Sequence, residues 1–331
     1  MKISMKWFSI IGIILFIIVL LNTDLKKLWE IMLGIKPIYI ILSLILFCLS
    51  LAVRSWKWKV LINLFNKDYT IWQAFKSYTL GVAFGSVTPG KAGDLIKVLD
   101  LKKVIGMETK QGISLSIFDK IIDLLILFGA GLICLIIISV IFSEKINLTW
   151  IIALLVIVLS LAVFFLTKPS RKIFNHILSS MKFIPQNIRD KILEIYNTFF
   201  DIIGAVGKNK NFINYLFLTI LSWLMLFSIP YFYAKSISLN VSIYYILLFI
   251  PVTLSIEVLP ITMLGIGTRD ATMILLFSLI SITKEQSVIL SMMFLVFANF
   301  PIILIGFYIG WKNKYTIDLG SIKEKLQKPS Q

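Results

Sequence analysis

Long uncharged stretches recur along the chain and predict a bundle of membrane-spanning helices. A helix needs roughly 20 apolar residues to cross a hydrocarbon core about 30 Å thick. Because a spanning segment must bond all its backbone polar groups internally, these runs predict an all-α integral membrane protein with about eight transmembrane helices. The long runs are 7–23, 37–53, 124–143, 146–167, 211–234, 236–256 and 286–311, the shorter one is 271–283, and a more polar one with Lys76 inside it is 71–89.

The composition supports this class and disfavours two others. Hydrophobic residues make up 58% of the chain and charged residues only 15%, against roughly 45–50% and 25% in ordinary soluble domains. The formal net charge is nevertheless +16, which is typical of proteins that bind nucleic acid or an anionic membrane surface. Nucleic-acid modules lack long uncharged runs. We therefore expect neither a water-soluble enzyme nor direct nucleic-acid binding.

The distribution of lysine and arginine predicts which segments face the cytoplasm. Short cytoplasmic loops carry an excess of these residues. If 71–89 enters the membrane and returns, the inner segments hold 24 basic and 9 acidic residues. If it crosses fully, the basic segment 168–210 lies outside, which the rule disfavours. We expect a multi-pass protein of the cell membrane with both termini cytoplasmic and with inner segments 1–6, 54–70, 90–117, 168–210 and 312–331.

One membrane domain is expected over residues 1–315, followed by a basic cytoplasmic tail over 316–331. Within that domain, apolar residues recur at helical spacing after Pro185, which predicts an amphipathic helix on the membrane surface or under the bundle. The basic, tryptophan-containing segment 54–59 is interpreted as an interface anchor. With a single histidine and two cysteines inside apolar runs, we expect no metal and no cofactor.

Three clusters of glycines and charged residues are expected at membrane depth. Inserting a charge there costs about 2.5–3.5 kcal/mol, so the charges that occur are functional candidates. We interpret the three clusters as candidate headgroup-binding sites. The first contains Pro89, Gly90, Lys91, Gly93 and Asp94. Proline stops a helix, the glycines let the backbone bend, and Asp94 opens a new helix. Free N–H groups at that helix start, with Lys91 beside them, would form a phosphate cradle. The alternative is a simple helix-breaking turn.

The second cluster is Asp119, Lys120 and Asp123, at the start of a helix that becomes wholly apolar. Asp119 and Asp123 are four residues apart and share a helix face. The alternative is that the acids merely favour a helix amino terminus at a wet interface.

The third cluster is Glu257, Gly265, Gly267, Arg269 and Asp270. The glycines would supply a bend, and the Arg269 fork suits a phosphate or carboxylate. The alternative is an Arg269 ion pair with Glu257 or Asp270 that holds the bundle together. Broken segments at 71–94 and 257–270 indicate a transporter site built from two halves of a pseudo-repeat.

The order and spacing of these motifs resemble the lysylphosphatidylglycerol synthase transmembrane family, also described as flippase-like. The likeness covers roughly residues 5–312. This sequence departs from the family at Lys91, where a glycine is common, and at Asp270, where a glutamate is common. The family's motif residues fall on Pro89, Gly90, Gly93, Asp94, Asp119, Asp123, Gly265, Gly267, Arg269 and Asp270.

The residues and this resemblance leave three alternative functions. The leading one is translocation of an anionic or aminoacylated phospholipid, or of a lipid-linked headgroup, with its phosphate held by Lys91, Arg269 and backbone N–H groups. The second is a phosphatidylglycerol lysyltransferase, or its membrane component, which serves lipid aminoacylation and cationic peptide resistance. Only about 20 residues follow Trp311, so lysyl transfer would require a separate soluble transferase or synthase. The third is a membrane scaffold for a lipid or glycolipid biosynthetic enzyme.

Overall fold

Helices are the only regular secondary structure in the described part of the chain. The computed structural model describes residues 24–65, 68–142, 186–207, 209–259, 262 and 264–313, with isolated positions between 152 and 180. No strand occurs among these residues, so the predicted all-α class is confirmed. The predicted spans 7–23 and 146–167 and the tail 316–331 lie wholly or largely outside the described residues.

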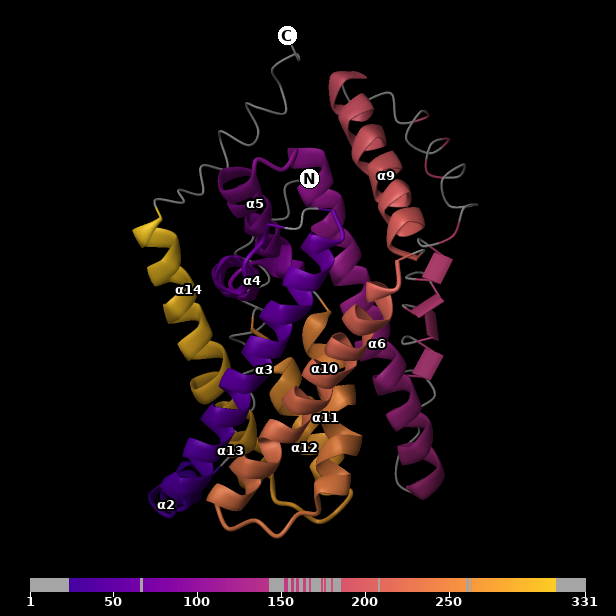
Figure 1. Cartoon of the computed structure of the whole chain (residues 1–331). Coiled ribbons are helices and arrows are strands. Elements are labelled where there is room, and N and C mark those ends of the chain that lie inside the picture. The colour runs from indigo at the N-terminus through magenta and orange to yellow at the C-terminus, as the bar shows by residue number, and fades with distance from the viewer. Residues whose placement is uncertain are drawn as a thin grey trace.

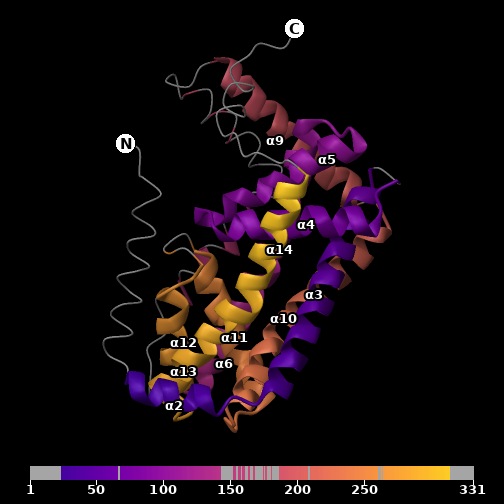
Figure 2. The ribbon, with the colours of Figure 1, turned by 90° about the vertical axis from the view of Figure 1, so that its left-hand side faces the viewer.

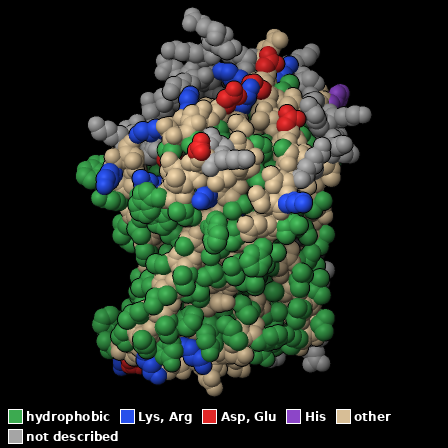
Figure 3. Space-filling model, in the orientation of Figure 1, with side chains coloured by type: hydrophobic (Ala, Val, Ile, Leu, Met, Phe, Trp, Pro, Cys, Tyr) green, Lys and Arg blue, Asp and Glu red, His purple; other side chains and the backbone are tan. Residues whose placement is uncertain are grey.

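Four apolar helices in the described residues are long enough to cross a membrane. The shortest has 26 residues, which at 1.5 Å per residue is about 39 Å. They run roughly along one long axis (Figure 1). Hydrophobic side chains cover the middle of the face seen in Figure 3, and charged side chains gather toward its two ends. The four are α3 (Pro37–Asn63), α6 (Thr109–Ile141), α10 (Asn211–Ser236), and α13 (Lys284–Phe294) continued through the π-helical turn η2 (Leu295–Asn299) into α14 (Phe300–Lys312).

Two shorter helices, α11 (Ile243–Val258) and α12 (Thr268–Ser278), form a re-entrant pair. At about 24 and 16 Å they are too short to cross separately. The Lys36 N–H donates to the Ser236 carbonyl oxygen at 2.8 Å, so α11 starts at the end of the bundle that carries α2 (Leu25–Leu33). The pair α11–α12 returns to that end. The expected break at 257–270 is its tip, and the predicted spans 236–256 and 271–283 are its two arms.

The segment around 71–94 also enters and returns, but from the opposite end. Figure 2 shows α4 (Ile71–Ser86) lying across the bundle, and α5 (Lys97–Ile105) back at the end away from α2. Between them runs a 3₁₀ helix, η1 (Pro89–Ile96). The expected new helix after Asp94 therefore begins as a tighter coil, and the α-helix starts only at Lys97.

The amphipathic segment after Pro185 is helix α9 (Gln186–Gly207), and it packs against α6. Its apolar face buries Phe199, Ile202 and Val206. The Ser114 hydroxyl of α6 donates to the Ile195 carbonyl oxygen at 2.9 Å. The sequence left open whether this helix lies on the membrane surface or packs under the bundle. In the structure it packs against the bundle. The ends of α5, α9 and α14 lie at the same end of the bundle, away from α2 (Figures 1 and 2), and their cytoplasmic location stays a prediction.

A Gly306→Leu substitution should separate α14 from α4. A Cβ at Gly306 would clash with the Ala83 Cβ and lie 2.8 Å from the Thr79 carbonyl oxygen. Overpacking of this kind costs about 1–3 kcal/mol, so we expect a lower unfolding temperature in detergent. Gly129→Leu on α6 is the matched control, because a Cβ there meets no atom within 4 Å. Equal unfolding temperatures for the two variants would contradict this packing.

Candidate functional site

A buried lysine joins two of the long helices. Lys57 of α3 places its Nζ 2.9 Å from Asp119 Oδ1 and 2.8 Å from Asp123 Oδ1, both on α6. The Lys57 side chain is 0% exposed. Tyr215 of α10 donates from its hydroxyl to Asp119 Oδ1 at 2.9 Å. Three long helices are therefore joined by two ion pairs and one hydrogen bond.

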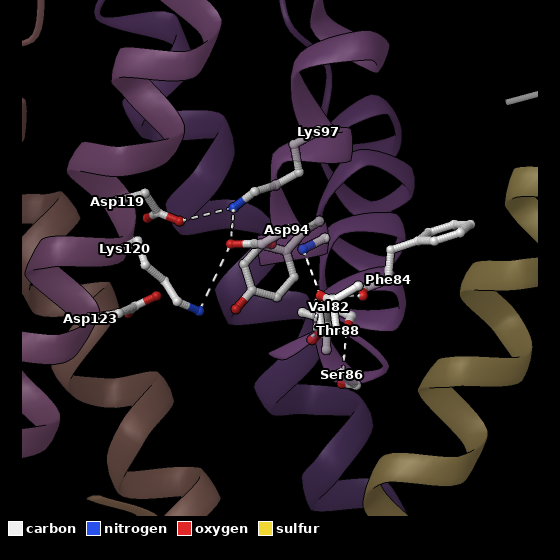
Figure 4. A network of polar contacts seen from close by, with 12 residues as sticks. Val82, Phe84, Ser86, Thr88, Asp94, Lys97, Asp119, Lys120 and Asp123 are labelled. Atoms are coloured by element: carbon white, nitrogen blue, oxygen red, sulfur yellow. Dashed lines mark hydrogen bonds and ion pairs between the residues drawn. The ribbon is translucent and has the colours of Figure 1, made fainter. Parts of the chain in front are cut away.

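The same network reaches the first re-entrant segment. Lys97 Nζ lies 3.1 Å from Asp94 Oδ2 and 3.4 Å from Asp119 Oδ2, and Lys120 Nζ lies 4.0 Å from Asp94 Oδ2. Figure 4 shows Asp94 facing the side chains of α6. The lysines Lys57, Lys97 and Lys120 thus balance the aspartates Asp94, Asp119 and Asp123. We call these six residues the upper cluster.

Two glycines allow α4 and η1 to pack closely around Asp94. A Cβ at Gly81 would lie 2.7 Å from Lys97 Cγ, and a Cβ at Gly93 would clash with the Phe84 carbonyl oxygen. The Gly93 N–H donates to Thr88 Oγ1 at 2.7 Å. This N–H of the expected phosphate cradle is therefore already bonded within the chain.

A second cluster closes the tip of the α11–α12 pair. Arg269 is 1% exposed. Its Nε donates to Ser291 Oγ at 2.8 Å, and its Nη1 lies 3.6 Å from Glu257 Oε2. The Ser291 hydroxyl also donates to Asp270, and Asp270 Oδ2 accepts the Gly267 N–H at 2.8 Å. We call Glu257, Gly265, Gly267, Arg269 and Asp270 the lower cluster.

The glycines of the lower cluster are required by its backbone. Gly265 and Gly267 have φ angles of +68° and +85°, in the left-handed region that favours glycine. A Cβ at Gly265 would lie 2.9 Å from Glu257 Cδ. The Gly-x-Gly-x-Arg-Asp pattern therefore forms a turn that starts α12 and presses Arg269 against α13.

Two adjoining pockets lie between the clusters. The larger has about 970 Å³ of empty space when its opening to solvent is included, and its lining contains Glu257 and Gly265. The smaller has about 570 Å³ and is lined by Asp94, Asp119 and other residues of the upper cluster. Six residues line both pockets and form their common wall: Arg54, Tyr78, Val82, Ser86, Trp223 and Val258.

Most of the expected site residues fall into these two clusters. Asp94, Asp119, Lys120 and Asp123 line the smaller pocket. Arg269 lies behind Glu257 and is not in the lining of either pocket. Pro89, Gly90 and Lys91 belong to η1, and the Lys91 side chain lies outside the described residues. In the described part of the chain, no group of three or more His, Cys, Asp or Glu side chains is arranged to hold a metal ion.

The interface-anchor interpretation of 54–59 is wrong for part of that segment. Lys57 and Trp58 are both 0% exposed, whereas Trp56 is 53% exposed. Helical spacing could have revealed this burial, because Arg54, Lys57 and Trp58 share one helix face. Arg54 lines both pockets. Sequence reasoning also missed Lys97, which had been counted only as one of several lysines in an inner loop.

A further buried contact fixes α5 outside the spanning helices. The Tyr69 hydroxyl lies 3.2 Å from Asp100 Oδ2 and donates to it. Burial, together with the Asp100 carboxylate, raises the pKa of Tyr69 above its ordinary value. The phenol therefore stays protonated at neutral pH and keeps this hydrogen bond.

The long apolar helices and the buried charges between them define a multi-pass integral membrane protein. The model of the family "Lysylphosphatidylglycerol synthase TM region" matches residues 7–306, so the chain belongs to this family, as the resemblance predicted. It is also 25% identical over 304 residues to a UPF0104 membrane protein of Methanocaldococcus jannaschii, which covers 85% of this chain and 88% of that protein. No solved structure gives a significant match.

A Lys57→Met substitution should destabilise the protein strongly. It leaves the Asp123 carboxylate without the lysine that lies 2.8 Å away, and breaking a buried ion pair in this way costs about 3–5 kcal/mol. Thermal unfolding in detergent checks the effect. Lys59→Met, two positions along α3, is the control and should change stability by no more than about 0.5 kcal/mol. A Lys57→Met protein as stable as this control would contradict the network.

The Arg269–Glu257 contact predicts a compensating double substitution. Arg269→Met leaves the Glu257 carboxylate without its buried cation, so we expect a clear drop in unfolding temperature. Adding Glu257→Gln removes this stranded charge and should recover part of the loss. If the double variant unfolds at or below the temperature of Arg269→Met, the two residues are not coupled as the structure indicates.

Proposed function

We propose that the protein moves a phospholipid, or a lipid-linked molecule, across the membrane through the pocket between its two re-entrant segments. One observation carries this proposal. Two segments that enter from opposite ends of the bundle reach the same hollow. Val82 and Ser86 near the end of α4, and Glu257 and Val258 at the end of α11, all line the larger pocket.

The lining of the larger pocket suits an amphipathic ligand. Among the charged side chains that the structure describes, Arg54 and Glu257 line it. A headgroup can contact these charges while its acyl chains remain against apolar side chains or lipid. The apolar part of the lining includes Phe47, Leu51, Leu254, Phe294 and Ile302.

The two re-entrant tips provide parts that can move against a fixed frame. Broken helices at the centre of a membrane commonly form transporter sites, and access changes when one part rocks against the other. In the proposed mechanism, the upper cluster fixes α3, α6 and α10 as the frame. The tips around Thr88 and Gly265 then change position around the headgroup. Arg269 acts through Glu257, and the upper cluster supplies the charges at the other end of the path.

The proposed direction of insertion follows the distribution of basic residues. The ends of α5, α9 and α14 would face the cytoplasm, beside the anionic headgroups that attract lysine and arginine. A lipid would then enter from the inner leaflet beside α4 and leave near the α11–α12 pair.

Val82→Trp should block this path. Val82 lines both pockets, and an indole ring there would fill the space that a headgroup needs. We expect movement of a fluorescent phospholipid in reconstituted vesicles, measured by dithionite quenching, to fall to the rate of protein-free vesicles.

Val140→Trp is the matched control, because Val140 is 74% exposed on the outer surface of α6. It should move lipid at the wild-type rate. Both variants are compared by gel filtration to establish that they fold. Lipid movement at the wild-type rate by folded Val82→Trp would reject this pocket as the path.

A further inference from the structure

We propose that Arg54 binds a phosphate group of the ligand, in place of Lys91 and Arg269, to which the sequence had assigned this role. This inference rests on the proposed function, since it names the residue and the ligand chemistry of the same pocket. It follows from three features of Arg54: its charge balance, its free hydrogen-bond donors and its position.

Charge balance separates Arg54 from the other cations near the pockets. Lys57, Lys97, Lys120 and Arg269 each have a carboxylate oxygen within 4.0 Å. No such ion pair is formed by Arg54 among the described residues. A cation in an apolar environment is costly unless a negative group accompanies it. The upper cluster is already balanced, so the partner of Arg54 must come from outside it.

The free donors of Arg54 have the geometry of an oxyanion fork. Its Nη1 donates to the Tyr78 hydroxyl at 3.4 Å, and its guanidinium carbon lies 4.8 Å from the centre of the Trp223 ring. Its Nε and Nη2 are buried and have no hydrogen-bond partner in the described residues. These two nitrogens share one edge of the guanidinium. That edge can donate two parallel hydrogen bonds to two oxygens of a phosphate.

The position of Arg54 places this fork on the proposed path. Arg54 is part of the common wall of the two pockets. Arg54 follows directly after the uncharged run 37–53, at the inner end of the apolar part of α3. A phosphate held there would stand at the entrance to the proposed path from the inner leaflet. Tyr78 and Trp223 hold the guanidinium in place from two sides.

Ligand-induced stabilisation of the purified protein tests the inference. The probes are dihexanoyl phosphatidylglycerol, glycerol 3-phosphate, and dihexanoylglycerol, which lacks the phosphate. A ligand that binds the folded state raises the unfolding temperature. We expect dihexanoyl phosphatidylglycerol to stabilise the wild type and dihexanoylglycerol to have no effect. In Arg54→Gln the apparent affinity for the phosphate probe should fall by about tenfold or more.

Two further variants guard against a general structural effect. Lys59→Gln, on the same helix, should respond to the probes as the wild type does. Arg54→Lys keeps the charge but loses the fork, so it should bind with intermediate affinity. Without any probe, Arg54→Gln should be at least as stable as the wild type, because it removes an uncompensated charge. A residue with a purely structural role would instead lose stability.

Each outcome bears on the inference. Equal stabilisation by glycerol 3-phosphate would support the phosphate site and identify a soluble ligand as its source. Equal binding of the phosphate probe by Arg54→Gln and wild type, or equal stabilisation by dihexanoylglycerol, would overturn it. If Val82→Trp moves lipid normally while phosphate binding still requires Arg54, the proposed function fails and the binding site stands. If Val82→Trp blocks movement while Arg54→Gln binds normally, only the present inference fails.

Discussion

The contact of Lys57 with Asp119 and Asp123 is the interaction on which the rest of the structure depends. In a membrane interior, water cannot satisfy a charge, so each buried ion needs a partner fixed by the fold. Lys57 holds α3 against α6, and Asp119 extends the contact to Lys97. The first re-entrant segment is thereby held at a defined place. The wall that it contributes to the pockets follows from this chain of ionic contacts.

The lower cluster solves the same problem in a different way. There one arginine is held by a serine hydroxyl, a backbone carbonyl and the Glu257 carboxylate. The lower cluster fixes a turn, whereas the upper cluster fixes the spacing of helices. Both clusters satisfy most of their polar groups internally. Arg54 belongs to neither cluster, and its Nε and Nη2 are buried without a hydrogen-bond partner in the described residues.

The sequence predicted the long helices and the buried acids but not their partners. Hydropathy identified α3, α6 and α10, because a long apolar run has few alternatives to a spanning helix. Asp119 and Asp123 stood out because they interrupt such a run. Lys57 did not, since it lies among other basic and aromatic residues at the end of one, and its partners are more than 60 positions away. Hydropathy also does not indicate whether an apolar helix crosses or turns back, so the runs 236–256 and 271–283 were counted as separate spans.

The irregular segments of the fold meet at the pockets. Thr88 and Asp94, at the first re-entrant tip, line one pocket each. Leu264 and Gly265 contribute from the second tip, and Asn299 from the π-helical turn η2. Non-helical backbone at membrane depth is tolerated only where it is buried in protein or borders a water-filled cavity, and π-helical turns often occur at functional sites. Regular helices held by ion pairs surround these segments. The convergence of three irregular segments on one hollow therefore supports the proposed path of a polar ligand independently of any single residue.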